Sequence, residues 1–188
     1  MANQDAAFGF KPSRSLVGGS IRNNVYKIAA NYGTSIFSGQ TVEAQAAGGI
    51  EAAAAGDTQQ LGVFGGVQYT DPTSGKPTFK PFYAASTNAA DLEAIVYDDP
   101  QLIFEVQHDG TGTAAMNFSA FDFTGVAGST ISGQSTQELD TSTSGTGGGF
   151  KQLSIVTDPS NDDTSSANAN AFVAFNTGEH VFKLTTAI

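Results

Sequence analysis

The sequence predicts an all-β protein, a compact β-barrel or sandwich of about ten short strands with an extended N-terminal arm and loops rich in Gly, Ser and Thr. Charged residues make up only 14% of the 188-residue chain, and small polar residues suit turns and short strands better than continuous helices. Apolar residues make up 39%, and 14 Phe with 5 Tyr supply large side chains for a core. Short apolar runs separated by turn signals follow one another along most of the chain.

We expect an N-terminal docking arm, residues 1–23, and a single all-β domain, residues 24–188, with a loop-rich insertion around 110–149. The arm has no sustained period, because apolar residues such as Phe10 and Ile21 are interspersed with Gly and Pro. A freely disordered tail is usually poorer in aromatic residues, so these side chains need a surface that buries them. That surface is either a partner or the arm's own domain, and the sequence leaves both possibilities open.

The first half of the domain contains short apolar runs bounded by Gly, Pro, Asn and Asp, the pattern of short strands. The clearest run is 61–69, in which one face is apolar at a period of two: Leu61, Val63, Val67 and Tyr69. Its three glycines are expected to mark a β-bulge or a close approach of two backbones. The stretch 51–55 is too short for a helix and is expected to be a loop or a strand edge. The strands expected here are 25–28, 35–38, 41–44, 61–69, 78–83 and 93–97.

The second half continues the pattern with longer loops. Leu102, Phe104 and Val106 are expected to share one face of a strand that begins after the turn at 98–101. The stretch 141–149 is expected to be a low-complexity turn or mobile loop. No internal repeat is recognisable, and no helix is expected beyond one turn around 89–92. The strands expected here are 102–107, 150–157, 172–175 and 180–184.

Charge divides the chain sharply. The first 27 residues carry four cations against one acid, a net charge of +3, whereas the remaining residues carry four lysines against 17 acids, a net charge of −13. Like charges at this ratio keep copies of the domain apart, while the front segment is attracted to an acidic or polar surface. The cations are Lys11, Arg14, Arg22 and Lys27.

Composition also excludes several classes of protein. The acidic domain argues against a nucleic-acid partner, because phosphate neutralisation needs clustered Lys and Arg. Four basic residues spread over an arm make a weak membrane anchor, and no stretch approaches the length of a membrane span. The N-terminus lacks the apolar region of a secretory signal, and the chain has no Cys. We therefore expect a soluble protein made in a cytoplasm, with no membrane and no nucleic-acid partner.

The sequence offers no catalytic signature, so we expect no enzyme, no cofactor, no metal and no catalytic residue. His108 and His180 are isolated in sequence, and a metal site would require the fold to bring them together with carboxylates such as Asp109 and Glu179. The acids of 158–163 lack the register of a calcium-binding EF-hand loop and are expected to form a solvated turn. Asp98-Asp99-Pro100 is expected to be a turn in which an Asp side chain caps backbone N–H groups.

Several short motifs resemble small structural proteins of tailed bacteriophages. The first two lie in the arm and at its end, and the others are spread over most of the chain. They are Phe8-Gly9-Phe10-Lys11-Pro12, 18–26, 62–69, 96–100, 128–130 and Asn176-x-x-Glu179-His180. The family that they resemble is that of capsid decoration, or cement, proteins, which bind the outside of the shell and reinforce it.

This resemblance implies that the major capsid protein is the partner and that the chain is a homo-oligomer, with a trimer favoured and a dimer possible. It implies the outer surface of the capsid in the virion as the location, after synthesis in the host cytoplasm. We expect the arm to order on the capsid, with apolar burial and charge contacts together. The expected capsid-binding residues are Phe8, Phe10, Lys11, Arg14, Leu16, Ile21 and Arg22.

Two other classes remain open on the sequence. A carbohydrate- or receptor-binding module of a phage fibre or an adhesin would use exposed Tyr and Phe rings as platforms for sugars, although Trp is absent. A hydrolase would need a pair of carboxyl groups at a defined separation, for which Asp98 and Asp99 are the candidates.

Overall fold

The structure, a computed structural model, describes residues 2–57, 59–125, 127–145, 147–176 and 178–183. Its regular elements are fifteen strands and three 3-10 helices of three residues each, so the predicted all-β class is confirmed. In chain order they are β1 (Lys11–Ser15), β2 (Asn24–Lys27), β3 (Ile36–Phe37), β4 (Thr41–Gln45), β5 (Gly49–Ala52), β6 (Gln60–Thr70), β7 (Pro77–Lys80), β8 (Phe82–Tyr83), β9 (Glu93–Tyr97), β10 (Leu102–Gln107), η1 (Ala114–Met116), β11 (Ala120–Phe121), β12 (Phe123–Thr124), β13 (Glu138–Leu139), η2 (Thr141–Thr143), β14 (Phe150–Ile155), β15 (Asn170–Phe175) and η3 (Val181–Lys183).

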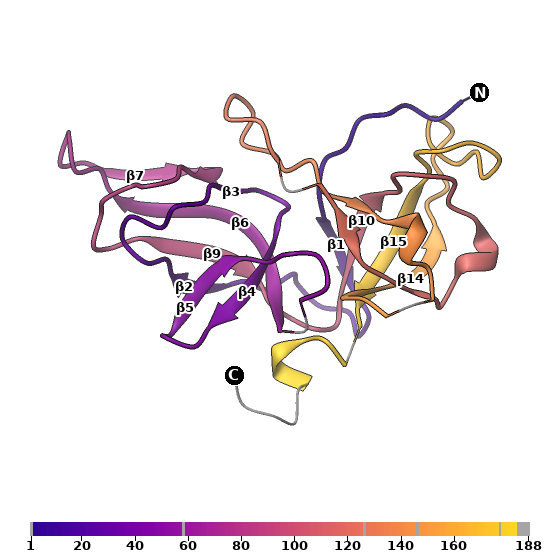
Figure 1. The fold of residues 1–188 in the computed structure, drawn as a ribbon, viewed down its shortest axis with the longest axis horizontal. Coiled ribbons are helices and arrows are strands. Elements are labelled where there is room, and N and C mark those ends of the chain that lie inside the picture. Colours follow the sequence, from indigo (N-terminus) through magenta and orange to yellow (C-terminus); the bar gives the residue numbers. More distant parts are fainter. Residues whose placement is uncertain (1, 58, 126, 146, 177, 184–188) are drawn as a thin grey trace.

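The strands form two lobes, each built on one antiparallel sheet (Figure 1). The first lobe, residues 24–97, holds a sheet of order β2-β9-β6-β4-β5, in which β7 also pairs with β6. The second lobe, β1 with residues 102–175, holds a sheet of order β1-β10-β15-β14-β11. The first sheet curls until its two edge strands meet at a parallel bridge between Ile28 and Ile50, although the barrel is not closed.

Each lobe has its own hydrophobic core. Ile36, Phe64 and Leu92 are fully buried in the first-lobe core, and Phe104, Phe121 and Phe150 are fully buried in the second-lobe core. Val63 of β6 belongs to the second-lobe core, whereas Leu61, Val67 and Tyr69 belong to the first-lobe core. The prediction that these four side chains share one face is therefore wrong, because β6 contributes to both cores and joins the two lobes.

The glycines of β6 mark the bulge that the sequence predicts. The register of β6 against β9 shifts between Phe64 and Gly66, and Gly66 has a φ of +144°, a value that L side chains rarely adopt. Close approach occurs as well, because a Cβ on Gly62 would lie 2.5 Å from the carbonyl oxygen of Tyr97. The bulge lets one long strand turn part of its length toward each core.

Residues 3–15, which we call the strap, pack on their own second lobe. Figure 1 shows this indigo segment running along the second lobe and entering the space between the lobes before β1. The side chain of Gln107 donates to the carbonyl oxygen of Gln4 at 2.8 Å and accepts from the N–H of Ala6 at 2.9 Å. Strand β1 then pairs with β10 as an edge strand. Of the two surfaces that the sequence left open, the strap uses its own domain.

Phe10 anchors the strap in the second-lobe core. Its ring stacks on Phe150 with centroids 4.1 Å apart and meets Phe123 edge-on at 6.4 Å. The neighbouring Gly9 has a φ of +74°, and a Cβ there would lie 2.6 Å from the carbonyl oxygen of Gly39. The N–H of Phe10 donates to that same oxygen at 2.8 Å. The strap is thus tied to the first lobe as well, through the turn between β3 and β4.

The structure refines the sequence prediction at three places. The expected strand 78–83 is divided by Pro81 into β7 and β8, because proline lacks the N–H that a ladder needs. In the described part of the expected strand 180–184, His180 forms one parallel bridge with Gln60 and the 3-10 helix η3 follows, while residue 184 lies outside the described residues. The described part of 110–149 contains three two-residue strands and two 3-10 helices.

The packing of Phe10 generates a stability prediction. Phe10→Ala should lower the free energy of unfolding by about 3–5 kcal/mol, because the substitution opens a cavity in a packed aromatic cluster. Phe118→Ala is the control, since this ring is exposed and its loss should change stability by less than about 0.5 kcal/mol. Urea unfolding measures both values. Equal stability of the two variants would contradict the role of Phe10 as an anchor.

Candidate partner-binding surface

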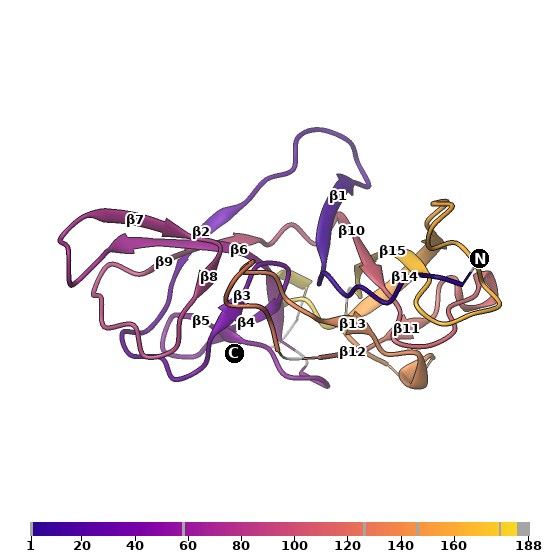
Figure 2. The ribbon, with the colours of Figure 1, turned by 90° about the horizontal axis from the view of Figure 1, so that it is seen from above.

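The connection between β1 and β2, residues 16–23, is the most exposed apolar segment near the N-terminus, and we call it the docking loop. Figure 2 shows it arching away from both lobes as it crosses from one to the other. Leu16 is 57%, Val17 72% and Ile21 38% exposed. A Cβ on Gly18 or Gly19 would meet no atom within 4 Å. The loop therefore presents apolar side chains to solvent with little support from the body beneath it.

Hydrogen bonds hold the two ends of the docking loop. The N–H of Leu16 donates to the carbonyl oxygen of Gln101 at 2.9 Å. Beyond the other end, the side-chain amide of Asn24 donates to the buried Asp98 at 2.8 Å, and the Tyr26 hydroxyl donates to the same carboxylate oxygen. Burial and this contact raise the pKa of Tyr26 above its ordinary value. Both ends are thus fixed on the turn between β9 and β10, while the middle projects.

The structure separates the seven predicted capsid-binding residues into three groups. Phe10 is fully buried in its own chain, so its ring is not part of the molecular surface, and Phe8 is half-buried at the junction of the lobes. Lys11 and Arg14 are exposed on the edge strand β1, where the Arg14 guanidinium lies 4.7 Å above the ring of Phe172. The remaining three, Leu16, Ile21 and Arg22, lie together in the docking loop and are exposed.

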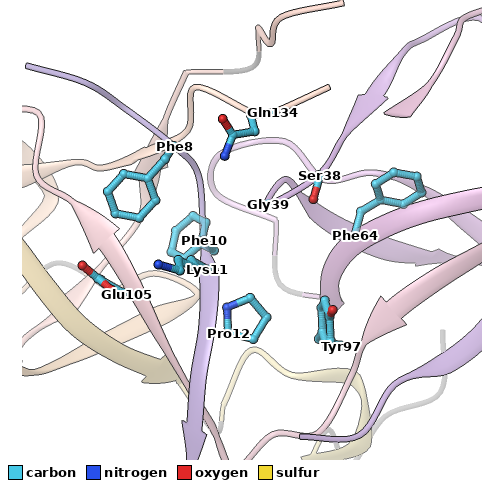
Figure 3. A pocket seen from close by; sticks show the side chains of 10 residues that line it. All are labelled: Phe8, Phe10, Lys11, Pro12, Ser38, Gly39, Phe64, Tyr97, Glu105 and Gln134. Carbon is cyan, nitrogen blue, oxygen red and sulfur yellow. The ribbon is translucent and has the colours of Figure 1, made fainter. Parts of the chain in front are cut away.

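Part of the strap forms one wall of a hollow of about 290 Å³ between the lobes (Figure 3). Phe8 and Lys11 lie on the strap side, Tyr97 and Ser38 lie on the side of the first lobe, and the amide of Gln134 points in from above. The volume is at the bottom of the range of about 300–1,000 Å³ that is typical of small-molecule sites. The hollow is therefore better described as a gap at the lobe junction than as a ligand site of ordinary size.

Acidic side chains gather where the first lobe meets the second. Glu43 and Glu51 are directly opposite each other on β4 and β5, and Asp57 follows in the next loop. Burial, with the charges of Asp57 and Glu51 and a hydrogen bond to Asp57, raises the pKa of Glu43 to about 7. Burial also raises the pKa of Asp122, on the second lobe, above its ordinary value. Several acidic side chains thus lie near one another where the lobes meet.

The two histidines pack against aromatic rings. Both are fully buried; His108 packs edge-on against Phe121 and His180 against Phe175. Burial lowers the pKa of His108 to about 4, so the ring is neutral at ordinary pH. Among the described residues, no group of three or more His, Asp or Glu is placed to hold a metal ion.

The acidic turns behave as the sequence predicts. Asp158 accepts from the N–H of Ser160 at 3.0 Å, which makes a local turn. Asp99 accepts from the N–H of Gln101 at 2.9 Å. The sequence did not reveal the role of Asp98, which is buried and accepts from two side chains of the β2 region. Asp98 and Asp99 are therefore engaged in separate contacts, Asp99 within its own turn and Asp98 with β2.

The raised pKa of Glu43 generates a pH prediction. A glutamate in the unfolded chain ionises near pH 4.5 and the folded one near pH 7, so the unfolded chain releases this proton first and stability falls as the pH rises through that window. Glu43→Gln should remove this fall and add about 1 kcal/mol to the free energy of unfolding at pH 8, a value reduced for solvent screening of a partly exposed group. Urea unfolding at pH 4.5 and pH 8 measures it, with Glu105→Gln on the second lobe as the control. A gain of the same size at both pH values would contradict the electrostatic cause.

Known proteins provide no relative of this chain. It matches no protein-family model, no curated protein and no solved structure. Within the ranges that the structure describes, no helix is long and apolar enough to cross a bilayer.

Proposed function

We propose that the protein is a bacteriophage capsid decoration, or cement, protein. In this role it binds the outside of the shell built by the major capsid protein, stabilises the shell, and performs no catalysis. The observation that carries the proposal is the docking loop, an exposed apolar and basic segment on an otherwise acidic chain. The resemblance of the N-terminal motifs to tailed-phage decoration proteins supports the same conclusion.

Within this proposal we assign the contact region to those N-terminal residues that are exposed. Because the strap is packed on its own lobe, the contact region is the docking loop together with the exposed Lys11 and Arg14 on β1. Arg14 and Arg22 are the stronger polar anchors, since a guanidinium pairs with a carboxylate through two parallel hydrogen bonds. Leu16, Val17 and Ile21 supply the apolar area that a shell would bury.

The charge of the chain has an effect both before assembly and during binding to the shell. Copies with a net charge of −10 repel one another before assembly, which disfavours premature association. The basic loop attracts an acidic region of the shell and accelerates encounter, an effect that salt weakens. The proposed contact therefore combines electrostatic steering with apolar burial.

One loop alone would bind with moderate affinity. Apolar burial contributes about 25 cal/mol per Å², whereas ordering a flexible residue costs about 1–2 kcal/mol. A homo-oligomer, with a trimer favoured, would present several loops to a symmetric shell at once. The second and third contacts then form at a high effective concentration.

The docking loop generates a direct binding prediction. The triple variant Leu16→Ser, Val17→Ser, Ile21→Ser should bind shells at least about tenfold more weakly than the wild type, because it removes the apolar contacts at the centre of the interface. The test is co-sedimentation with shells of the major capsid protein that lack this protein. The melting temperature of the free variant should stay unchanged, since the three side chains are exposed.

Ile131→Ser is the matched control for this experiment. Ile131 is 98% exposed at the tip of a different loop, so its loss should leave shell binding intact. Arg22→Glu should weaken binding most at low salt. The proposal fails if the wild type does not bind shells, or if the triple variant binds as tightly as the wild type.

A second candidate function, carbohydrate or receptor binding, is favoured by one other surface. Phe79 is exposed on β7 and lines an open groove of about 500 Å³ together with Gln68, Asp91 and Glu93. Aromatic rings beside amide and carboxylate groups suit the apolar faces and hydroxyls of sugars. Part of this polar set is already used, since Asp91 accepts from the N–H of Thr70 and Glu93 accepts from Gln68.

This second candidate is tested separately. If it holds, the purified wild type should bind members of a glycan array, and Phe79→Ser should abolish that signal while shell binding stays unchanged. Phe118→Ser is the control, because Phe118 is an exposed ring on the second lobe. Absence of any glycan signal for the wild type would remove the second candidate.

A further inference from the structure

A second apolar surface lies next to the docking loop, on the first lobe. Strand β2, the hairpin of β4 and β5, and η3 enclose a groove of about 460 Å³. Its rim carries Val25 and Phe182, which are 51% and 57% exposed. Leu61, Val181 and the ring of Tyr26 also line it. Two large apolar side chains are thus exposed around one concave surface. This arrangement differs from the single, scattered apolar residues that are normal on a protein surface.

We propose that this groove, the β2–η3 groove, binds an extended segment of the major capsid protein that carries an apolar side chain beside a carboxylate. The inference rests on the proposed decoration function and names the chemistry of the segment recognised. Val25 follows the docking loop by two residues, so the groove and the loop are continuous along the chain. One partner surface can therefore engage both.

The polar groups that line the groove determine this chemistry. The Tyr26 hydroxyl donates its one hydrogen to Asp98. The Gln45 amide donates one N–H to Glu51 and keeps a second N–H. Among the described lining residues Lys27 is the only charged one. Its ammonium group lies 3.0 Å from Glu93 and its side chain is 60% exposed. Since an ammonium group has three donors, Lys27 can bind a second carboxylate.

Charge complementarity favours an acidic segment as the occupant. The region from Lys11 to Lys27 is locally basic and attracts carboxylates. An acidic segment with one apolar side chain matches both the cation at the rim and the apolar walls. The groove is formed by folded elements, so binding there requires little ordering of this protein.

The experiment compares exposed positions inside and outside the groove. Val25→Ser and Phe182→Ser should each weaken binding to undecorated shells about tenfold, because each removes an apolar contact that is buried on binding. Lys27→Glu should weaken binding more strongly at low salt than at high salt, because salt screens the interaction between exposed charges. Phe118→Ser and Ile131→Ser, exposed apolar positions elsewhere, should bind within about twofold of the wild type.

The outcomes separate this inference from the proposed function. If the wild type does not bind shells, the decoration function itself fails. If the wild type binds, the docking-loop variants bind weakly and the groove variants bind normally, the groove inference fails while the function stands. If the groove variants instead dissociate an oligomer of the free protein in analytical ultracentrifugation, the occupant is a second copy and the inference is overturned. Melting temperatures monitor folding, and Val25→Ser decides the test if Phe182→Ser unfolds.

Discussion

The insertion of Phe10 into the second-lobe core is the contact on which the shape of the N-terminal region depends. Its ring stacks on Phe150, its N–H donates to Gly39 of the first lobe, and β1 continues from it along β10. Once these contacts fix β1 on one lobe, the chain must cross to β2 on the other lobe within eight residues. The crossing has no sheet to join and no core to enter, so its apolar side chains stay in solvent. The docking loop is thus a geometric consequence of a buried aromatic ring.

The division of charge follows the same geometry. Glu43, Glu51, Asp57 and Asp122 gather where the lobes meet, whereas four of the eight basic residues lie along β1, the docking loop and β2. A cluster of carboxylates at a lobe junction is a source of repulsion that the fold relieves by holding a proton on Glu43. Apolar burial in the two cores outweighs that repulsion. Of the cations along these elements, Lys27 pairs with Glu93 and Arg14 lies over Phe172, whereas the described residues contain no ion pair of Lys11 or Arg22.

The sequence predicts the elements whose signal is local. The sequences of β6 and β10 show a clear period of two in apolar residues, and the glycines of β6 predict the bulge. Both signals are local, because they depend only on neighbouring residues. Strand β1 escaped prediction because it contains Pro12, lies at a sheet edge, and pairs with residues about ninety positions away. The destination of Phe10 is likewise a tertiary contact that no local pattern encodes. The same limit applies to the β2–η3 groove, whose walls come from opposite ends of the chain.

The two proposed contact regions differ in what binding requires of them. The docking loop is held only near its ends, so a partner must order its middle residues and offset the entropy lost. The β2–η3 groove is built from two strands, a hairpin and a 3-10 helix, and it needs little rearrangement. A preformed groove therefore fixes position and orientation, after which the loop closes on the partner as an intramolecular step. On this argument the groove variants should lose orientation and affinity together, whereas loop variants should lose affinity alone. Maps of shells decorated with each variant at equal occupancy distinguish the two roles. Density for the bound protein should be less well ordered for the groove variants than for the loop variants.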